Sequence, residues 1–260
     1  MAYEPELALA NRLADAARAA IRPLFRTGIG SERKDDRSPV TEADRAAEQA
    51  MRDLIAAAFP NDAIHGEEFG ATTGTSGRTW VLDPIDGTTG FMAGRPIFGT
   101  LIALVQEGWP VLGMIDQAIL GERWIGITGK PTTFNGQPVR TRPCPSLAEA
   151  ALATTGPHYF NDRQGETFMA LAAKTDHKRM VMGGDCYNYA MLASGHLDVV
   201  CEANLKLHDY AALIPVVEGA GGIMCDWNGD PLHAASDGRV LALGDPARVE
   251  DVVEALGCAH

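Results

Sequence analysis

The most informative stretch of this 260-residue sequence is Trp80-Val81-Leu82-Asp83-Pro84-Ile85-Asp86-Gly87-Thr88-Thr89. Its apolar first half is typical of a buried strand, and Pro84 is expected to end that strand because proline has no backbone N–H to donate. Asp86 then begins a new segment. Two carboxylates three residues apart around such a turn, on Asp83 and Asp86, can converge on one point.

The same turn offers the ligands that hard divalent cations prefer. The carboxylates of Asp83 and Asp86 and the carbonyl oxygen of Ile85 would suit Mg²⁺ and leave room for water and phosphate. A helix beginning at Gly87 and Thr88 would add free N–H groups that favour a phosphate. Taken alone, the pattern also fits an Asx-type turn with solvated carboxylates.

Two further groups of acids can join this pair. Glu67 and Glu68 follow a short predicted strand, and only one of them can be a ligand because adjacent side chains on a strand point in opposite directions. A surface acidic pair would look the same. Asp209 stands at the start of an apolar helix, where it could also be a simple N-terminal helix acid. His208 beside it is expected to pack behind the ligands, since no histidine spacing in the sequence is typical of zinc.

Composition restricts the partners. Hydrophobic residues make up 46% and charged residues 22% of the chain, which is typical of a soluble globular protein. The formal net charge of -12 argues against nucleic acid and anionic membranes as partners. A phosphate substrate would then require bound cations, or positive charge of its own. The sequence shows no secretory signal and no apolar run long enough for a membrane span, so a cytoplasmic location is expected. The five cysteines include no C-x-x-C pair, which indicates free thiols.

Hydrophobic spacing predicts two lobes that meet near Arg142 and Pro143. In the first lobe we predict an amphipathic helix at residues 5–26 and a second helix from Thr41 to Pro60. A mobile loop is predicted at 70–77 and an antiparallel meander at 97–128. In the second lobe strands alternate with helices, one of them at about 208–219. The predicted class is α/β, with α+β character in residues 1–142 and an α/β lobe in residues 143–260.

Taken together, the acidic motifs of this sequence resemble those of the inositol monophosphatase family. The matching segments are Gly66-Glu67-Glu68, the stretch from Asp83 to Thr88, His208-Asp209-Tyr210-Ala211-Ala212, and Glu218-Gly219-Ala220-Gly221-Gly222. Their order and spacing are those of the family over nearly the whole chain. The resemblance implies a layered α/β/α/β/α sandwich, a homodimer, a small phosphate monoester as substrate, and two or three Mg²⁺ ions.

The resemblance also implies a role for each candidate site residue. It assigns the metal ions to Glu67, Asp83, Asp86, Asp209 and the Ile85 carbonyl. The ions would activate a water for attack on phosphorus, and no covalent phosphoenzyme would be needed.

Three side chains would act on that water, and two residues would bind the phosphate. Glu67 would hold the water and help to deprotonate it, and the Thr88 hydroxyl would lie beside it with Asp44 as its hydrogen-bond partner. Gly87 and Thr88 would bind the phosphate. Asp44 also stands three residues after Thr41, the spacing of a capping box, and the two roles of Asp44 can coexist.

Within the family, the chain looks closer to the histidinol-phosphate phosphatases. The segments that carry this likeness are 115–120, 122–126, 132–136 and 184–190. Inositol phosphatases usually have a small neutral residue in place of Asp185 and a tryptophan in place of His208. Histidinol phosphate carries an ammonium and an imidazole, which Asp185 and Glu202 would attract.

Other interpretations of these residues remain open. Asp185 could instead cap a helix, and Glu202 could be a surface charge at the end of a strand. An inositol or broad-specificity monophosphatase is the alternative function. A regulator without turnover would require a missing ligand, and no ligand is missing.

Overall fold

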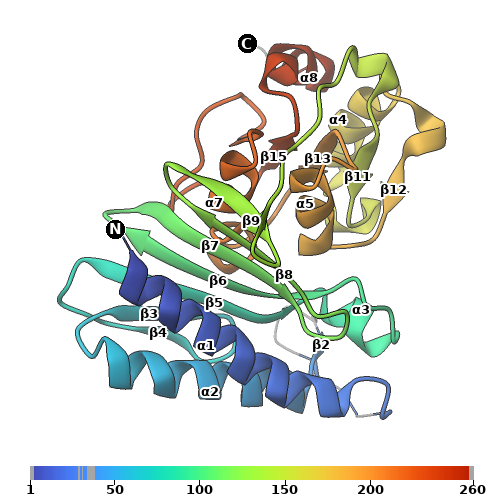
Figure 1. Cartoon of the computed structure of the whole chain (residues 1–260). Coiled ribbons are helices and arrows are strands. Elements are labelled where there is room, and N and C mark those ends of the chain that lie inside the picture. The colour runs from blue at the N-terminus through green and yellow to red at the C-terminus, as the bar shows by residue number, and fades with distance from the viewer. Residues whose placement is uncertain (1–2, 29, 31, 34–38, 258–260) are drawn as a thin grey trace.

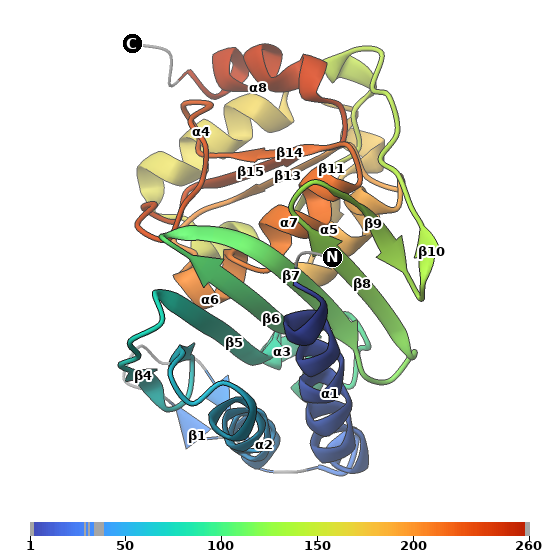
Figure 2. The ribbon, with the colours of Figure 1, turned by 60° about the vertical axis from the view of Figure 1, so that its left-hand side comes forward.

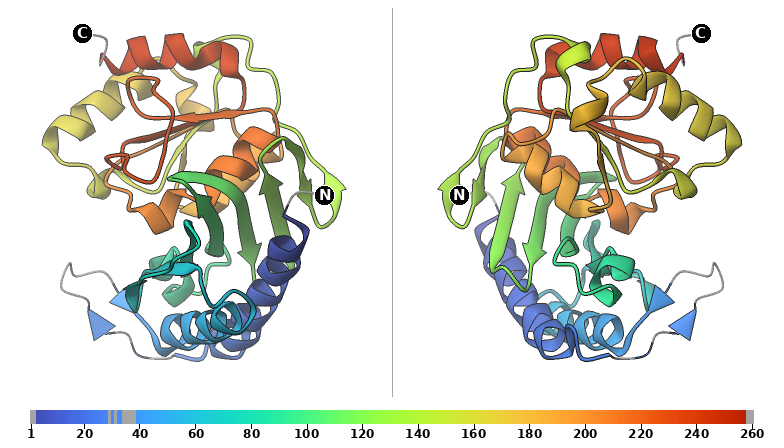
Figure 3. Two further views of the ribbon diagram at one scale, coloured as in Figure 1. Left: turned by 90° about the vertical axis from the view of Figure 1, so that its left-hand side faces the viewer. Right: turned by 90° about the vertical axis from the view of Figure 1, so that its right-hand side faces the viewer.

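Helices and sheets alternate in five layers in the computed structural model of this chain, which describes residues 3–28, 30, 32–33 and 39–257 (Figure 1). Helices cover one face of a large sheet, lie between it and a smaller sheet, and cover the far face of the smaller sheet (Figures 2 and 3). The predicted α/β/α/β/α sandwich is confirmed. None of the helices among the described residues is long and apolar enough to cross a membrane.

The outer layer at the N-terminal end consists of two amphipathic helices, α1 (Glu4–Ile21) and α2 (Glu42–Ala58). A 3₁₀ turn at Arg22–Leu24 follows α1. The predicted capping box opens α2: the Thr41 hydroxyl accepts from the amide of Ala43, and the Asp44 carboxylate accepts from the amide of Thr41. A two-stranded ribbon of β1 (Glu32–Arg33) and β2 (Pro39–Val40) precedes α2.

The large sheet has eight strands in the order β10-β9-β8-β7-β6-β5-β3-β4. They are β3 (Ala63–Gly66), β4 (Gly70–Thr72), β5 (Arg78–Asp86), β6 (Gly99–Gln106), β7 (Trp109–Gln117), β8 (Glu122–Ile127), β9 (Lys130–Phe134) and β10 (Gln137–Pro138). All neighbours are antiparallel except β3 and β5. The prediction of a loop over residues 70–77 was wrong for its first part. Residues 70–72 form the exposed edge strand β4, which buries no side chain and so leaves no hydrophobic pattern.

The small sheet has five strands in the order β12-β11-β13-β15-β14. They are β11 (Leu152–Thr154), β12 (Val181–Met182), β13 (Val199–Glu202), β14 (Ile223–Cys225) and β15 (Val240–Leu243). Helices α5 (Cys186–Ala193), α6 (Leu207–Tyr210) and α7 (Leu213–Gly219) lie between the sheets, and α4 (Asp162–Ala172) and α8 (Val249–Leu256) lie outside. Short 3₁₀ turns occur at Leu147–Glu149, Pro157–Tyr159, His177–Arg179 and Pro246–Arg248.

The helix predicted over 208–219 is broken into α6 and α7. Pro215 explains the break, because it has no N–H for the carbonyl of Ala211 and its ring would clash with that carbonyl in a continuous helix. The layer between the sheets packs closely. A Cβ on Gly113 of β7 or on Gly126 of β8 would collide with the backbone of Ala212 or of Pro215. These two glycines let α7 approach the large sheet and so fix the place of α6 beside β5.

Three hydrophobic clusters form between successive layers. One lies between the outer helices and the large sheet, one between the two sheets, and one between the small sheet and α4 with α8. The four cysteines among the described residues are buried thiols that form no disulfide with one another; Cys258 lies outside the described residues. The division of the chain into lobes 1–142 and 143–260 stays a prediction.

Candidate active site

An irregularity in β5 brings two acids to the same side of the strand. Asp83 pairs with Leu101, the register then shifts, and pairing resumes between Asp86 and Gly99. The prediction that the strand ends at Pro84 was therefore wrong. A proline is tolerated at such a bulge, and its carbonyl accepts a hydrogen bond from the Thr100 hydroxyl at 2.8 Å. The bulge places Asp83 and Asp86 close together, as their spacing predicts.

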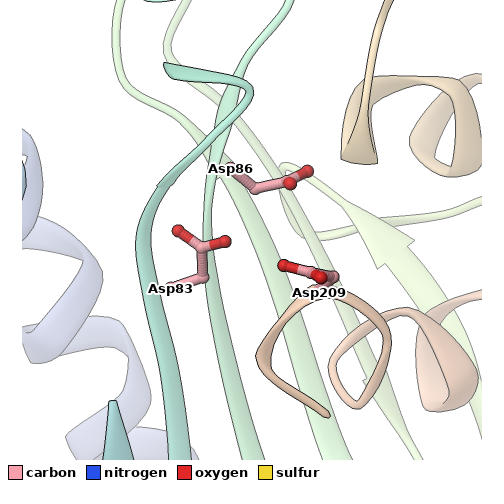
Figure 4. Close-up of side chains that lie close together, drawn as sticks. All are labelled: Asp83, Asp86 and Asp209. Atoms are coloured by element: carbon pink, nitrogen blue, oxygen red, sulfur yellow. The ribbon is translucent and has the colours of Figure 1, made fainter. Parts of the chain in front are cut away.

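The third acid of this cluster comes from the other end of the chain. Asp209 lies on α6, and one carboxylate oxygen of each of Asp83, Asp86 and Asp209 lies within 4.8 Å of the others (Figure 4). Asp209 is held by the backbone amide of Lys206, which donates to its Oδ2 at 2.6 Å, and His208 Nε2 lies 3.5 Å from its Oδ1. His208 packs on His65 with 5.9 Å between the ring centroids, and it also lines the cavity around the three aspartates.

The electrostatics of this cluster call for a cation. Burial, and after it the charges of Glu67, Asp86 and Asp209, raise the pKa of Asp83. Burial and the charges of Asp185 and Asp209 raise the pKa of Asp86. Within the described part of the chain, Asp83 Oδ1 is buried and accepts no hydrogen bond. Converging carboxylates with an unused buried oxygen fit a hard divalent ion such as Mg²⁺.

The turn after β3 brings Glu67 to the same cavity. Glu67 lines the cavity together with the three aspartates and Ile85, whereas Glu68 is not among the lining residues. The amide of Glu67 donates to the carbonyl of Leu82 at 3.1 Å, which ties the turn to β5 just before Asp83. The two glutamates lie in a turn instead of on the strand. Only one glutamate of this pair lines the cavity, as the sequence predicts.

Thr88 lines the cavity, and Asp44 lies next to it. Thr88 opens the short helix α3 (Thr88–Met92), and its Oγ1 lies 3.0 Å from the Ile85 carbonyl oxygen and 3.4 Å from Asp44 Oδ1. The other oxygen of Asp44, Oδ2, accepts from the amide and the hydroxyl of Thr41 at 2.8 and 2.6 Å. One oxygen of Asp44 thus caps α2 while the other faces Thr88, so the two predicted roles are compatible.

Asp185 and Glu202 line the same cavity of about 540 Å³. Asp185 precedes α5, but its side chain makes no capping hydrogen bond, and its φ of 44° is unusual for a residue with a side chain. It packs on Gly87, where an added Cβ would lie 2.9 Å from Asp185 Oδ2. Gly87 itself has a φ of 88°. Glycine at position 87 therefore supports both the turn and the contact with Asp185.

Glu202 lies at the buried end of β13 and is only 2% exposed. Its Oε1 accepts from the amide and the hydroxyl of Thr155 at 2.6 and 2.9 Å. Burial raises its pKa to about 8, and burial with the charge of Asp209 raises that of Asp185 to about 6. A solvated surface charge does not describe Glu202.

Sequence reasoning missed several residues of the cavity. The backbone amide of Cys186 donates to Asp86 Oδ2 at 2.6 Å, and Thr155 holds Glu202. The lining also includes His158 and Tyr159. Cys186 could have been anticipated because it follows Asp185, a candidate helix cap, and the amides of a first helical turn are free. The others carry no local signal, because the fold brings them to the cavity from distant segments.

Comparisons with known proteins agree with this fold. The chain matches the inositol monophosphatase family over residues 2–256. It is 45% identical over 258 residues to the chloroplastic bifunctional phosphatase IMPL2 of Arabidopsis thaliana, covering 96% of this chain and 74% of that protein. It is 35% identical over 259 residues to a histidinol-phosphatase of Chlorobaculum parvum, covering 97% of each. The solved structure of an inositol monophosphatase from Zymomonas mobilis superposes with a TM-score of 0.91 at 49% identity, covering 99% of each chain.

The chain belongs to the inositol monophosphatase family. It is therefore a phosphomonoesterase of a metal-dependent class, and the acidic cluster of Asp83, Asp86 and Asp209 is present in it.

Proposed function

We propose that this protein hydrolyses histidinol phosphate to histidinol and inorganic phosphate with Mg²⁺ bound by Glu67, Asp83, Asp86, Asp209 and the Ile85 carbonyl. The observation that carries the proposal is the position of Asp185 and Glu202. Both line the cavity of the metal-binding acids, and neither is among the ligands that we assign to the metal ions. Carboxylates beside the leaving alcohol would repel an anionic alcohol and would attract a neutral one only weakly. The presence of two carboxylates there therefore fits a cationic alcohol.

The two carboxylates are ordered along the cavity. Asp185 packs on Gly87, which directly follows Asp86. Glu202 is bound instead by the amide of Thr155, at 2.6 Å. Asp185 is therefore the nearer of the two to the metal cluster. In histidinol phosphate, the ammonium is two carbons from the ester oxygen and the imidazole is farther away. We assign Asp185 to the ammonium and Glu202 to the imidazole.

The chain's own groups account for the remaining steps. The bound ions supply Lewis-acid stabilisation of the phosphate charge and acidify the attacking water. Glu67 accepts a proton from the water that attacks phosphorus. The Thr88 hydroxyl, which can donate to Asp44 or to the Ile85 carbonyl, presents a lone pair to that water and orients it. The amides of Gly87 and Thr88 bind the phosphate. The P–O bond to the alcohol breaks as the bond to water forms, and the leaving alkoxide takes a proton from solvent water to give the alcohol.

A second function is favoured by one of the comparisons. The Zymomonas mobilis protein, 49% identical to this chain, is described as an inositol monophosphatase. In that case Asp185 and Glu202 would accept hydrogen bonds from hydroxyl groups. Charge distinguishes the two functions, because an inositol has none to offer. The same metal-binding acids serve both functions.

Asp185→Asn and Glu202→Gln are expected to lower kcat/KM for histidinol phosphate about 10- to 150-fold each, the value of a charge-assisted hydrogen bond. Hydrolysis of inositol monophosphate should change far less, since both substitutions keep the shape of the side chain. Phosphate release measured for both substrates gives the decisive ratio. If both substrates lose activity equally, the carboxylates have a structural role and the histidinol assignment fails.

Phosphoethanolamine separates the two carboxylates. It carries an ammonium two carbons from the ester oxygen and has no imidazole. Asp185→Asn should reduce its hydrolysis, whereas Glu202→Gln should leave it nearly unchanged. The reverse pattern would show that the order of the two residues along the cavity is not the order in which they meet the substrate.

A further inference from the structure

A buried ion pair on α2 reaches the turn that carries Glu67. Glu48 and Arg52 are one helical turn apart, and Arg52 Nε donates to Glu48 Oε1 at 2.7 Å. The side chain of Glu48 is 0% exposed and that of Arg52 is 10% exposed. Glu48 Oε2 accepts from the amide of Glu68 at 2.7 Å, and its Oε1 accepts from the amide of Phe69 at 3.1 Å. Arg52 Nη2 donates to the carbonyl of Gly70.

These contacts hold the turn on both sides of Glu67. The amides after Glu67 are bound to α2, and its own amide is bound to the carbonyl of Leu82 at 3.1 Å. Gly66, before it, has no side chain, and a Cβ there would occupy the space of the Glu48 carboxylate. The backbone around Glu67 is therefore fixed from β5 and from α2 together.

Stability alone is a poor reason for this pair. Burying two charges is costly, and a buried ion pair commonly adds no stability over apolar residues of the same volume. A carboxylate is, however, a side chain that can accept from two successive amides and an arginine at once. The same helix holds Asp44, one turn before Glu48, against Thr88. Thus α2 sets the positions of both Glu67 and Thr88.

We propose that Glu48 and Arg52 are positioning residues that orient Glu67 for metal binding. The inference rests on the proposed role of Glu67 as a ligand. Neither residue is among those that line the cavity, so both act through the backbone of the turn. Removing the carboxylate should loosen the turn and weaken the site. Partners that orient metal ligands typically contribute about 10- to 100-fold in metal affinity or activity.

The test compares Glu48→Gln, Glu48→Asp, Glu67→Gln and the control Asp53→Asn. Asp53 is an exposed acid on the same helix, hydrogen-bonded to Gln49. The dissociation constant for Mn²⁺ is measured by electron paramagnetic resonance on the metal-free proteins without substrate. The Mg²⁺ concentration for half-maximal turnover is measured alongside it. Glu48→Gln should raise both values by about 10-fold or more, and Asp53→Asn should change neither.

Glu48→Asp keeps the charge beside Arg52 but shortens the reach to the two amides. It should fold and still bind Mn²⁺ more weakly, so the test stands if Glu48→Gln fails to fold. Parental Mn²⁺ affinity in folded Glu48 variants, together with weakened binding in Glu67→Gln, would overturn the positioning role while keeping the ligand set. Parental affinity in Glu67→Gln would overturn the positioning role and the proposed ligand set together.

Discussion

Asp83→Asn is expected to reduce kcat/KM in saturating Mg²⁺ by roughly 10²–10³-fold, the loss typical of one electrostatic group at a reaction centre. Asp83 is 2% exposed, and its Oδ1 accepts no hydrogen bond from the described residues. The charge of this carboxylate is therefore available to a cation. Asparagine keeps the shape and removes the charge, so weaker metal binding accounts for the loss. Phosphate release and Mn²⁺ binding measure the two effects separately.

Without metal, Asp83→Asn should be more stable than the parent, although its activity is lower. Burial and three neighbouring acids raise the pKa of Asp83 in the folded protein. Its contribution to stability is therefore complete below the pKa of the unfolded chain and is lost as pH rises through the folded pKa. At pH 8 in chelator, Asp83→Asn should melt above the parent because asparagine cannot ionise. With Mg²⁺ the order should reverse, since the ion stabilises only the protein that binds it.

Thermal unfolding with chelator and with Mg²⁺ thus provides an internal control. A misfolded variant would melt below the parent under both conditions. Asp83→Asn with parental turnover, or with the full Mg²⁺ shift in melting temperature, would contradict the assignment of Asp83 as a ligand.

Thr88→Ala is expected to lower kcat by roughly 10²-fold or more with little change in KM. Its hydroxyl lies 3.0 Å from the Ile85 carbonyl oxygen and 3.4 Å from Asp44 Oδ1, and it is proposed to orient the attacking water. That interaction is strongest in the transition state, so its loss appears in kcat. Positioned proton-transfer groups typically contribute about 10²- to 10⁴-fold. Steady-state kinetics with histidinol phosphate measures both constants.

Thr88→Ser is the matched control, because it keeps the hydroxyl and removes only a methyl group. It should restore most of the lost kcat. If alanine and serine at position 88 behave alike, or if Thr88→Ala keeps the parental kcat, the hydroxyl has no part in orienting water and Thr88 serves only to begin α3.

The parts of the site that lie within short segments of sequence could be predicted. Asp83 and Asp86 lie close together because they are only three residues apart along the backbone. The bulge in β5 brings them together as the predicted strand end would have done. The capping box of Thr41 and Asp44 is likewise a local pattern. Asp209 is different: its local pattern fits a plain helix acid as well as a ligand, and only the family resemblance assigned it to the metal ions.

Features that depend on tertiary packing escaped the sequence. Glu202 is buried because segments distant in the sequence, among them those of Thr155 and Trp227, pack around the end of β13, and a single acidic residue at a strand end does not reveal this. The strand β4 is exposed along its whole length, so it leaves no hydrophobic pattern. The break between α6 and α7 has a local cause, Pro215, which the prediction of one helix over 208–219 did not take into account. The carboxylate of Glu48 forms hydrogen bonds to backbone amides, which no side-chain motif records. The homodimer, the cytoplasmic location and the two-lobe division stay predictions.

Phosphate release from a panel of esters in Mg²⁺, with a chelator-treated control, tests the proposed activity most directly. The panel comprises histidinol phosphate, inositol monophosphate and adenosine bisphosphate at matched concentrations. We expect Mg²⁺-dependent release with the highest kcat/KM for histidinol phosphate. Release in chelator at the Mg²⁺ rate, or a higher kcat/KM for inositol monophosphate than for histidinol phosphate, would contradict it.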